Sequence, residues 1–237
     1  MKAMIFAAGL GTRFKPWTDQ HPKALAVVNG KTLLQRAVEY LQQYGINEVV
    51  VNVHHFAEQV EQAVAESKGW GSRIHISDER DELLDTGGGM LKAKQWLETG
   101  TFVTLNVDIL SDANLKDFLV EHQQDNAVIT LATSDRDSSR KLIFNKYDRL
   151  CGWRNESSGE EKIVLEAKDH FPKAYSGMAI FEPAVFNLTK LTGKFSLIDL
   201  YLELAHDNKI SSWDHSGTKL LDVGKPGSVE EAERIFA

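Results

Sequence analysis

The chain alternates short apolar runs with segments in which apolar residues recur at helical spacing. Residues 3–8 are apolar without interruption and residues 48–53 are nearly so, a pattern typical of strands buried on both faces of a parallel sheet. Between them, Thr32 can cap a helix and Gly45 can end it. Repeated strand and helix units of this length predict a mostly parallel mixed sheet with helices on both faces.

The alternation continues to about residue 135 and then changes. Up to that point we expect helices at 57–65, after the glycines at 87–89 and at 115–124, with strands at 73–77, 102–107 and 127–133. Beyond it we expect a hairpin through 145–149, a polar loop at 154–162, strands at 175–181 and 218–224, and helices at 183–191, 197–207 and from Pro226. We find no linker and no repeat, so we predict one domain over residues 1–237.

The net charge bears on which partners the protein can bind, and the cysteine content and the lack of a long apolar span bear on its cellular compartment. Binding to a nucleic-acid backbone needs a basic surface, whereas the net charge is −7 and the Lys and Arg residues are spread out. The sequence shows no signal peptide and no apolar span of about 18 residues, and Cys151 is its single cysteine. We therefore expect a cytoplasmic protein with neither a nucleic-acid nor a membrane partner.

The loop after the first strand carries two glycines and a cluster of cations. Ligands of open α/β sheets bind beyond the carboxyl ends of the strands, so this loop is where a phosphate is expected. Gly9 and Gly11 allow close backbone approach to an anion, Thr12 adds a hydroxyl, and Arg13 and Lys15 add positive charge. The pattern indicates an anion site.

Other interpretations of these glycines are weaker. A dinucleotide fingerprint needs a third glycine where Phe14 stands, and an acidic residue near Asn52 and His54. A P-loop ending at residues 29–32 needs a glycine where Leu25 stands. A plain strand-to-helix turn remains as the alternative without function.

The longer pattern A-A-G-L-G-T-R-F-K-P-W-T, followed by H-P-K-A-L, resembles the signature of the sugar-1-phosphate nucleotidyltransferases, or nucleoside-diphosphate-sugar pyrophosphorylases. The resemblance implies a Rossmann-like three-layer αβα sandwich, the fold of that family. It implies that Lys23 reaches a phosphate from the far side of the loop. It further implies that the triphosphate is held by Ala8, Gly9, Gly11, Thr12 and Arg13.

The segment L-L-D-T-G-G-G-M resembles the second glycine-rich loop of the family. The resemblance implies that Gly87 and Gly88 lie against the nucleobase and that Thr86 shapes its pocket. Taken alone, the segment is equally compatible with a helix N-terminus capped by Thr86.

Two aspartates follow apolar strands at positions where the family carries acidic residues. Asp108, in N-x-D after Asn106, and Asp222, in D-V-G, resemble the metal-binding aspartates of the family. Two carboxylates suit one Mg²⁺ that keeps water and phosphate oxygens as its other ligands. Either aspartate alone could equally be a strand-end cap.

The acceptor site is expected within residues 135–173 and the strand that follows. Lys162 resembles a family lysine near the sugar phosphate, although Ile163 stands where a proline is usual, and a solvated loop lysine is the alternative. The segment with Ser176 and Gly177 resembles a family strand that approaches the sugar. Asn106 is also expected among the residues that bind the sugar phosphate. The resemblance thus divides the domain into a nucleotide half at about 1–110 and a sugar half at about 111–237.

The implied reaction is Mg²⁺-dependent transfer of a nucleotidyl group from an NTP to a sugar 1-phosphate, in which Arg13, Lys23 and Asp108 carry the catalysis. Within the family, the short length, T-G-G-G and N-x-D favour UTP with an N-acetylmuramate-type or hexose-type acceptor, for a cell-envelope precursor. Alternatives are mannose 1-phosphate with GTP, a cytidylyltransferase of phosphocholine or another phospho-alcohol, and a regulatory protein that binds nucleotide without turnover. We expect a monomer or homodimer.

Overall fold

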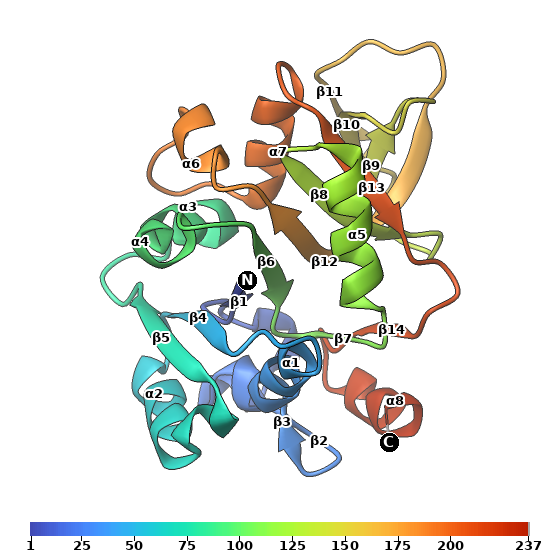
Figure 1. Cartoon of the computed structure of the whole chain (residues 1–237). Helices are drawn as coiled ribbons and strands as arrows, with labels where there is room; N and C mark the ends of the chain where they lie inside the picture. The colour runs from blue at the N-terminus through green and yellow to red at the C-terminus, as the bar shows by residue number, and fades with distance from the viewer. Residues whose placement is uncertain (237) are drawn as a thin grey trace.

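The fold is built on one ten-stranded sheet, seen here in a computed structural model that describes residues 1–236. Its strands follow the order β11-β10-β9-β12-β6-β1-β4-β5, while β8 pairs with β12 and β13 pairs with β8 (Figure 1). They are β1 (Lys2–Phe6), β4 (Glu48–Val53), β5 (Arg73–Asp78), β6 (Phe102–Asn106), β8 (Ile129–Ser134), β9 (Arg140–Phe144), β10 (Leu150–Asn155), β11 (Glu160–Ile163), β12 (Phe171–Phe181) and β13 (Ile210–Asp214).

Helices cover both faces of the sheet, as predicted, and give three layers (Figure 1). One apolar core lies under α1 (Leu33–Gln42), α2 (Ala57–Glu66), α5 (Leu115–Asp125) and α8 (Gly227–Ile235). The other lies under α3 (Asp85–Lys92), α4 (Lys94–Leu97), α6 (Val185–Leu188) and α7 (Leu197–Ala205). The strand β1 serves both cores, because Ala3 and Ile5 face the first while Met4 and Phe6 face the second.

The direction of the strands changes across the sheet. The strands β6, β1, β4 and β5 are parallel, as the first part of the sequence predicts. The long strand β12 then pairs antiparallel with β6, β8 and β9, and extends the sheet into the second part of the chain. The carboxyl ends of β1, β4 and β6 therefore open at one edge, where the first loop leaves the sheet.

Two short ribbons stand apart from the main sheet. The strands β2 (Val27–Val28) and β3 (Lys31–Thr32) form a hairpin whose turn holds Asn29 and Gly30 at positive φ, so the P-loop-like residues 29–32 are a plain turn. The strand β14 (Leu220–Asp222) pairs with β7 (Ile109–Ser111). This second ribbon brings the C-terminal segment back to the end of β6.

Three predicted elements differ from the structure. The glycines 87–89 lie inside α3 rather than before it, and the lack of side chains at Gly87 and Gly88 lets the helix pack closely on residues 193–196. The polar segment 154–162 completes a second hairpin between β10 and β11 instead of a loop. The strand β13 was not predicted, and α6 is shorter than expected.

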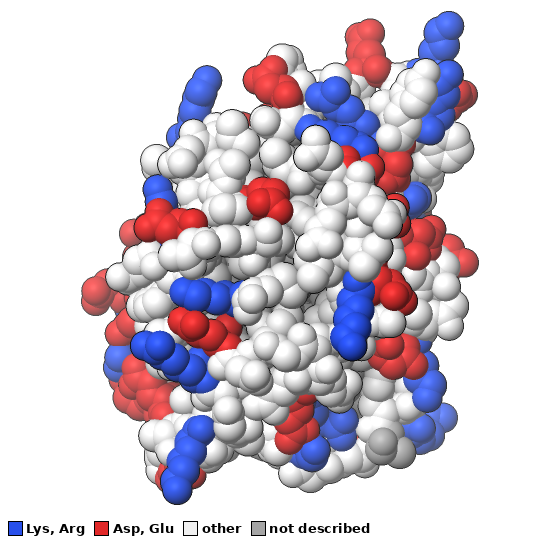
Figure 2. Space-filling view, in the orientation of Figure 1, with Lys and Arg blue, Asp and Glu red and all other residues white. Residues whose placement is uncertain are grey.

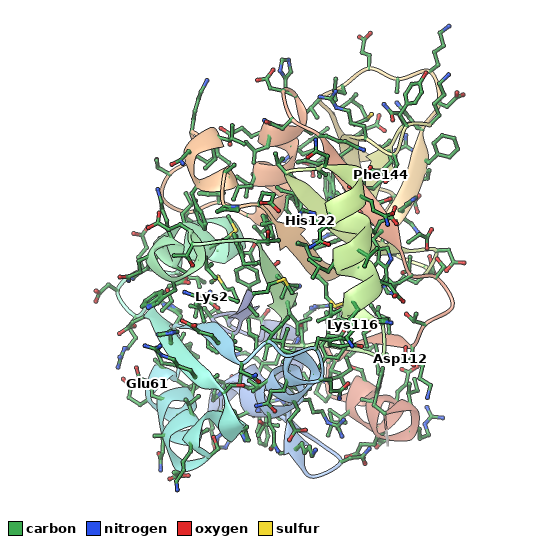
Figure 3. All side chains as sticks on the ribbon, viewed as in Figure 1. Lys2, Glu61, Asp112, Lys116, His122 and Phe144 are labelled. Carbon is green, nitrogen blue, oxygen red and sulfur yellow. The ribbon has the colours of Figure 1, made fainter. Side chains whose placement is uncertain are left out.

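Two buried histidines make stability depend on pH. The side chains of His122 and His215 are almost fully buried, His122 on α5 (Figure 3) and His215 beside β12. Nδ1 of His122 lies 2.7 Å from Thr130 Oγ1, and Nε2 of His215 lies 2.7 Å from Ser176 Oγ. Burial lowers the pKa of both imidazoles, although Glu182, 3.1 Å from Nε2 of His122, opposes the effect there, so folding favours the neutral form of each ring.

We expect the free energy of unfolding to fall as the pH drops below the unfolded-state histidine pKa of about 6.5. The reason is that the histidines then bind more protons in the unfolded chain than in the folded chain. For each histidine, the free energy of unfolding falls by up to about 1.4 kcal/mol per pH unit. Urea unfolding at pH 7.5 and 5.5 measures the effect, and His215→Asn should reduce it. Equal stability at both pH values would contradict the assignment.

Candidate active site

Three adjoining cavities lie at the carboxyl ends of the parallel strands. The central cavity, of about 270 Å³, is lined by Phe6, Ala7, Gly9, Gly11, Thr12, Arg13, Lys23, Thr86, Asn106, Val107, Asp108 and Gly224. The α3 cavity, of about 340 Å³, shares the first loop and continues to Asn52, Leu83, Asp85, Thr86 and Lys194. The cationic cavity, of about 530 Å³, shares Arg13 with the central one.

Gly11 lets the first loop fold over Lys23. Its φ is +60°, and a Cβ there would stand 2.8 Å from Thr18 Cγ2 and 3.2 Å from Lys23 Cβ, so a larger residue would be both strained and crowded. The hydroxyl of Thr18 donates to the carbonyl oxygen of Gly11 at 2.9 Å and holds this conformation. The loop thus packs directly on the Lys23 side chain.

The two aspartates, far apart in sequence, lie next to each other. The amide of Val223 donates to the carbonyl oxygen of Asp108 at 2.8 Å, because β14 pairs with the strand that follows Asp108. Nζ of Lys23 forms an ion pair with Oδ2 of Asp108, and Nη2 of Arg13 lies 3.9 Å from Oδ2 of Asp222. Two carboxylates and two cations therefore meet in one cluster.

The cluster suits a divalent cation. Oδ1 of Asp222 is buried and has no hydrogen-bond partner among the described residues, which leaves a hard oxygen ligand free. Burial and the neighbouring charge of Asp108 raise the pKa of Asp222, so a cation placed between the carboxylates would relieve their repulsion. Within residues 1–236 no group of three or more acidic, His or Cys side chains forms a complete metal cage. A Mg²⁺ held here would take its remaining ligands from water and phosphate.

The cationic cavity contains residues that the sequence analysis did not select. It is lined by Arg13, Arg136, Ser138, Ser139, Arg140, Lys141, Leu142, Trp153, Tyr175, Ile198 and Asp222. Arg136 donates to the carbonyl oxygen of Tyr175 at 2.8 Å, and Lys141 donates to that of Arg136 at 3.0 Å. Its three cations beyond Arg13 lie within residues 136–141, between the end of β8 and the start of β9, where a few basic residues in a polar stretch give only a weak signal in the sequence. On the face that the space-filling view presents, positive and negative side chains are intermixed (Figure 2).

Most of the residues selected from the sequence line these cavities. The members that do so are Ala8, Gly9, Gly11, Thr12, Arg13, Lys23, Thr86, Asn106, Asp108 and Asp222. Lys162 lies next to the cationic cavity, since its ammonium group stands 5.8 Å from the ring centre of Trp153, which lines that cavity.

Four selected residues lie behind the cavity walls. The amides of Gly87 and Gly88 donate to the carbonyl oxygen of Phe195 at 3.0 and 3.2 Å, and a Cβ on Gly87 would stand 2.3 Å from the Phe195 ring. Ser176 is fully buried on His215. A Cβ on Gly177 would stand 3.1 Å from Nδ2 of Asn106. These residues shape the walls from behind.

Thr86 does not cap α3 as the alternative supposed. It lies inside the helix, and its hydroxyl oxygen accepts from the amide of Leu197, at the start of α7, at 2.9 Å. The segment with the three glycines is therefore held against the 193–197 region by both backbone and side chain.

Comparison with known proteins accounts for this arrangement. The MobA-like NTP transferase domain matches residues 3–190, which is most of the chain. The chain belongs to this family. This NTP transferase is 32% identical to the N-acetylmuramate alpha-1-phosphate uridylyltransferase of Caulobacter vibrioides, over 99% of this chain and 96% of that protein. It is 27% identical to the mannose-1-phosphate guanylyltransferase catalytic subunit beta of Xenopus tropicalis, over 95% of this chain and 62% of that one.

Solved structures carry the same fold. HddC from Yersinia pseudotuberculosis, in complex with GMP-PN, aligns over 100% of this chain and 99% of its own with a TM-score of 0.80 at 20% identity. The αβα architecture expected from the sequence is therefore confirmed, and so is membership among the sugar-1-phosphate nucleotidyltransferases. None of the described helices combines the length and the apolar character needed to cross a membrane.

Proposed function

We propose that this NTP transferase transfers the uridylyl group of UTP to a sugar 1-phosphate, with Mg²⁺ as cofactor. The sugar of this acceptor carries a carboxylate, as in N-acetylmuramate 1-phosphate. The products are the UDP-sugar and pyrophosphate. The observation that carries the proposal is the cationic cavity, which adjoins the aspartate pair through Arg13 and Asp222. The relative from Caulobacter vibrioides, whose name states this substrate, supports it.

In the proposed reaction an oxygen of the sugar phosphate forms a bond to the α-phosphorus, and the bond from the α-phosphorus to the bridging oxygen of pyrophosphate breaks. A phosphate monoester dianion needs no base to activate it, so the protein must position two anions and neutralise their charge. Arg13 stands between the two cavities and can contact both substrates. Lys23, under the glycine loop, faces the triphosphate.

Asp108 and Asp222 would hold the metal ion at the junction of the two cavities. Mg²⁺ bound there supplies charge neutralisation at the α-phosphate and orients its oxygens. Asp222 is ready for this role because its Oδ1 has no other described partner. Asp108, which is ion-paired with Lys23, would be the second carboxylate ligand, and the ammonium group of Lys23 would bind a phosphate oxygen beside it.

The acceptor class follows from the number of cations. Arg13 and Arg136, both near Asp222, are enough for the phosphate of the acceptor. Arg140 and Lys141 lie farther along the 136–141 segment and would meet a second anionic group on the sugar. N-acetylmuramate has such a group, the carboxylate of its lactyl ether, whereas N-acetylglucosamine and glucose do not. The aromatic Trp153 and Tyr175 would pack against the sugar ring.

The experiment is a matrix of the four NTPs with N-acetylmuramate 1-phosphate, N-acetylglucosamine 1-phosphate, mannose 1-phosphate and phosphocholine, scored by pyrophosphate release. We expect the highest kcat/KM with UTP and N-acetylmuramate 1-phosphate. The preference over N-acetylglucosamine 1-phosphate should be about 10-fold to 100-fold, from a charge-assisted contact worth about 1.5 to 3 kcal/mol.

The variant Arg140→Gln should remove most of that preference and leave the rate with N-acetylglucosamine 1-phosphate unchanged. Lys190→Gln, at an exposed position just after α6, is the matched control. A preference for GTP with mannose 1-phosphate, or for CTP with phosphocholine, would replace the proposal by those activities. Nucleotide binding without pyrophosphate release from any pair would make the protein a regulatory binder.

The two parts of the chain would divide the work. We propose that residues 1–110 hold most of the nucleotide and that residues 111–237 hold the sugar, with Asp222 completing the metal site. Because NTPs are the donors, we propose a cytoplasmic enzyme that supplies a nucleotide sugar for the cell envelope.

A further inference from the structure

A buried polar pair joins the two loops that line the α3 cavity. Asn52, on β4, is 2% exposed, and Glu79, just after β5, is 0% exposed. The reaction outlined above uses neither side chain. The large majority of polar groups buried so deeply are hydrogen-bonded, and the partners of this pair indicate what it holds in place.

Asn52 holds the start of the glycine loop. The parallel ladder between β1 and β4 ends at Phe6 and Asn52, where β1 leaves the sheet. Beyond that point Oδ1 of Asn52 accepts from the amide of Ala7 at 2.7 Å and from that of Ala8 at 3.3 Å. The side-chain amide therefore continues the ladder into the loop and fixes the direction in which the chain reaches Gly9.

Glu79 holds the opposite wall. Its Oε1 accepts from Nδ2 of Asn52 at 2.7 Å, and its Oε2 accepts from the amide of Leu84, at the start of α3, at 3.1 Å. Both carboxylate oxygens are thus occupied by donors from different segments. A continuous chain of hydrogen bonds runs from Ala7 through Asn52 and Glu79 to Leu84.

The pair also explains the third glycine of T-G-G-G. A Cβ on Gly89 would stand 2.6 Å from Oε1 of Glu79 and 3.0 Å from Nδ2 of Asn52. Real Cβ atoms do not approach that closely, so α3 can pass over the pair only because this position lacks a side chain. Three neighbouring parts of the chain therefore fit around Asn52 and Glu79: the start of the glycine loop, the amide of Leu84, and Gly89.

We propose that Asn52 and Glu79 are positioning residues that lock the phosphate loop to the first turn of α3, so that the nucleotide site is formed before the nucleotide arrives. The inference rests on the proposed function, because it takes the cavities between these loops as the nucleotide site. Without the pair, each loop must be ordered at the expense of binding energy, which weakens NTP affinity. The proposed acceptor site is built on β9, β10 and β12, so removing the pair should leave the affinity for the sugar 1-phosphate unchanged.

A swap of donor and acceptor distinguishes this role from simple core packing. Asn52→Asp places two carboxylates face to face, and Glu79→Gln leaves a donor facing either Asn52 Nδ2 or the amide of Leu84. In the double variant, the new amide at position 79 can donate to the new carboxylate at position 52. Its carbonyl oxygen can still accept from Leu84, while the position 52 carboxylate still accepts from Ala7 and Ala8. The hydrogen bonds and the total charge are then restored.

The test measures equilibrium binding of UTP and of GTP, each with Mg²⁺, to the full chain by calorimetry, together with KM for both substrates and the Tm. We expect each single variant to raise Kd and KM for the nucleotide about 10-fold or more, with KM for the sugar 1-phosphate within about twofold. The double variant should return to within about threefold of the native protein. If a single variant does not fold, the double variant is compared directly with the native protein.

Thr130→Val is the control, since it removes a buried hydroxyl on β8, bonded to His122 and Ser211, that does not line the cavities. It should lower the Tm without changing nucleotide affinity. Native affinity in the folded single variants, or a folded double variant that binds no better than they do, would overturn the inference. If the native protein binds neither nucleotide, the proposed function fails instead.

Discussion

Replacing Asp108 by asparagine should lower kcat about 10³-fold or more while the protein stays folded. Asparagine keeps the shape of the side chain but removes the charge that would hold the metal and that balances Lys23. A loss of this size corresponds to about 4 kcal/mol of transition-state stabilisation, within the range that metal and oxyanion contacts contribute. Pyrophosphate release under saturating Mg²⁺, with the Tm as a check of folding, measures it.

Asp112 provides a matched control on the same ribbon. Its Oδ1 accepts from the amide of Lys219 at 2.7 Å, and it lines a separate groove beside α1. Asp112→Asn should therefore affect stability slightly and turnover hardly at all. Pyrophosphate release by Asp108→Asn within about tenfold of the native rate, while Asp112→Asn behaves normally, would remove Asp108 from the metal site.

The second large effect is expected at Arg13. Arg13→Ala should reduce kcat/KM about 10²-fold, about 3 kcal/mol, because it removes a charge placed where the transferring phosphate sits. The side chain lines both the central and the cationic cavity, so KM should rise for the nucleotide and for the acceptor together. Arg13→Lys should recover only part of the loss, since a lysine keeps the charge but not the planar fork.

Lys15 is the control for Arg13. It belongs to the same exposed loop, but its ammonium group pairs with Asp19 at 2.8 Å. Lys15→Ala should leave kcat/KM within about twofold, because exposed ion pairs contribute little. An Arg13→Ala protein that changes KM for one substrate alone would show that the arginine does not bridge the two.

The parallel half of the fold could be predicted because its signals are local. The run at residues 3–8, the Thr32 cap and the apolar spacing of α1 all appear in the structure as expected. The strand β13 could not be found in the same way, since Ser211 and Ser212 interrupt its apolar character and its partner β8 lies far away in sequence. The hairpin β10–β11 was hidden by the exposed, charged residues of an edge strand.

The site shows the same division. The glycine loop, Lys23 and the two aspartates follow family spacing and were selected from the sequence. The packing roles of Gly87 and Gly88 were not accessible, because their neighbours Phe195 and Gly193 come from a distant segment of the chain. Arg136, Arg140 and Lys141 gave a weak signal in a polar stretch, and only the cavity that they line distinguishes them from solvated cations.

The ribbon of β7 and β14 has a consequence for how the proposed metal site assembles during folding. The glycine loop and Asp108 belong to the parallel part of the sheet, whereas Asp222 is brought beside Asp108 by the antiparallel pairing of three residues of β14 with β7. A protein in which this ribbon has opened, or from which proteolysis has removed it, would keep one of the two proposed metal ligands. Chemical competence would therefore be lost by a local opening that leaves the main sheet intact.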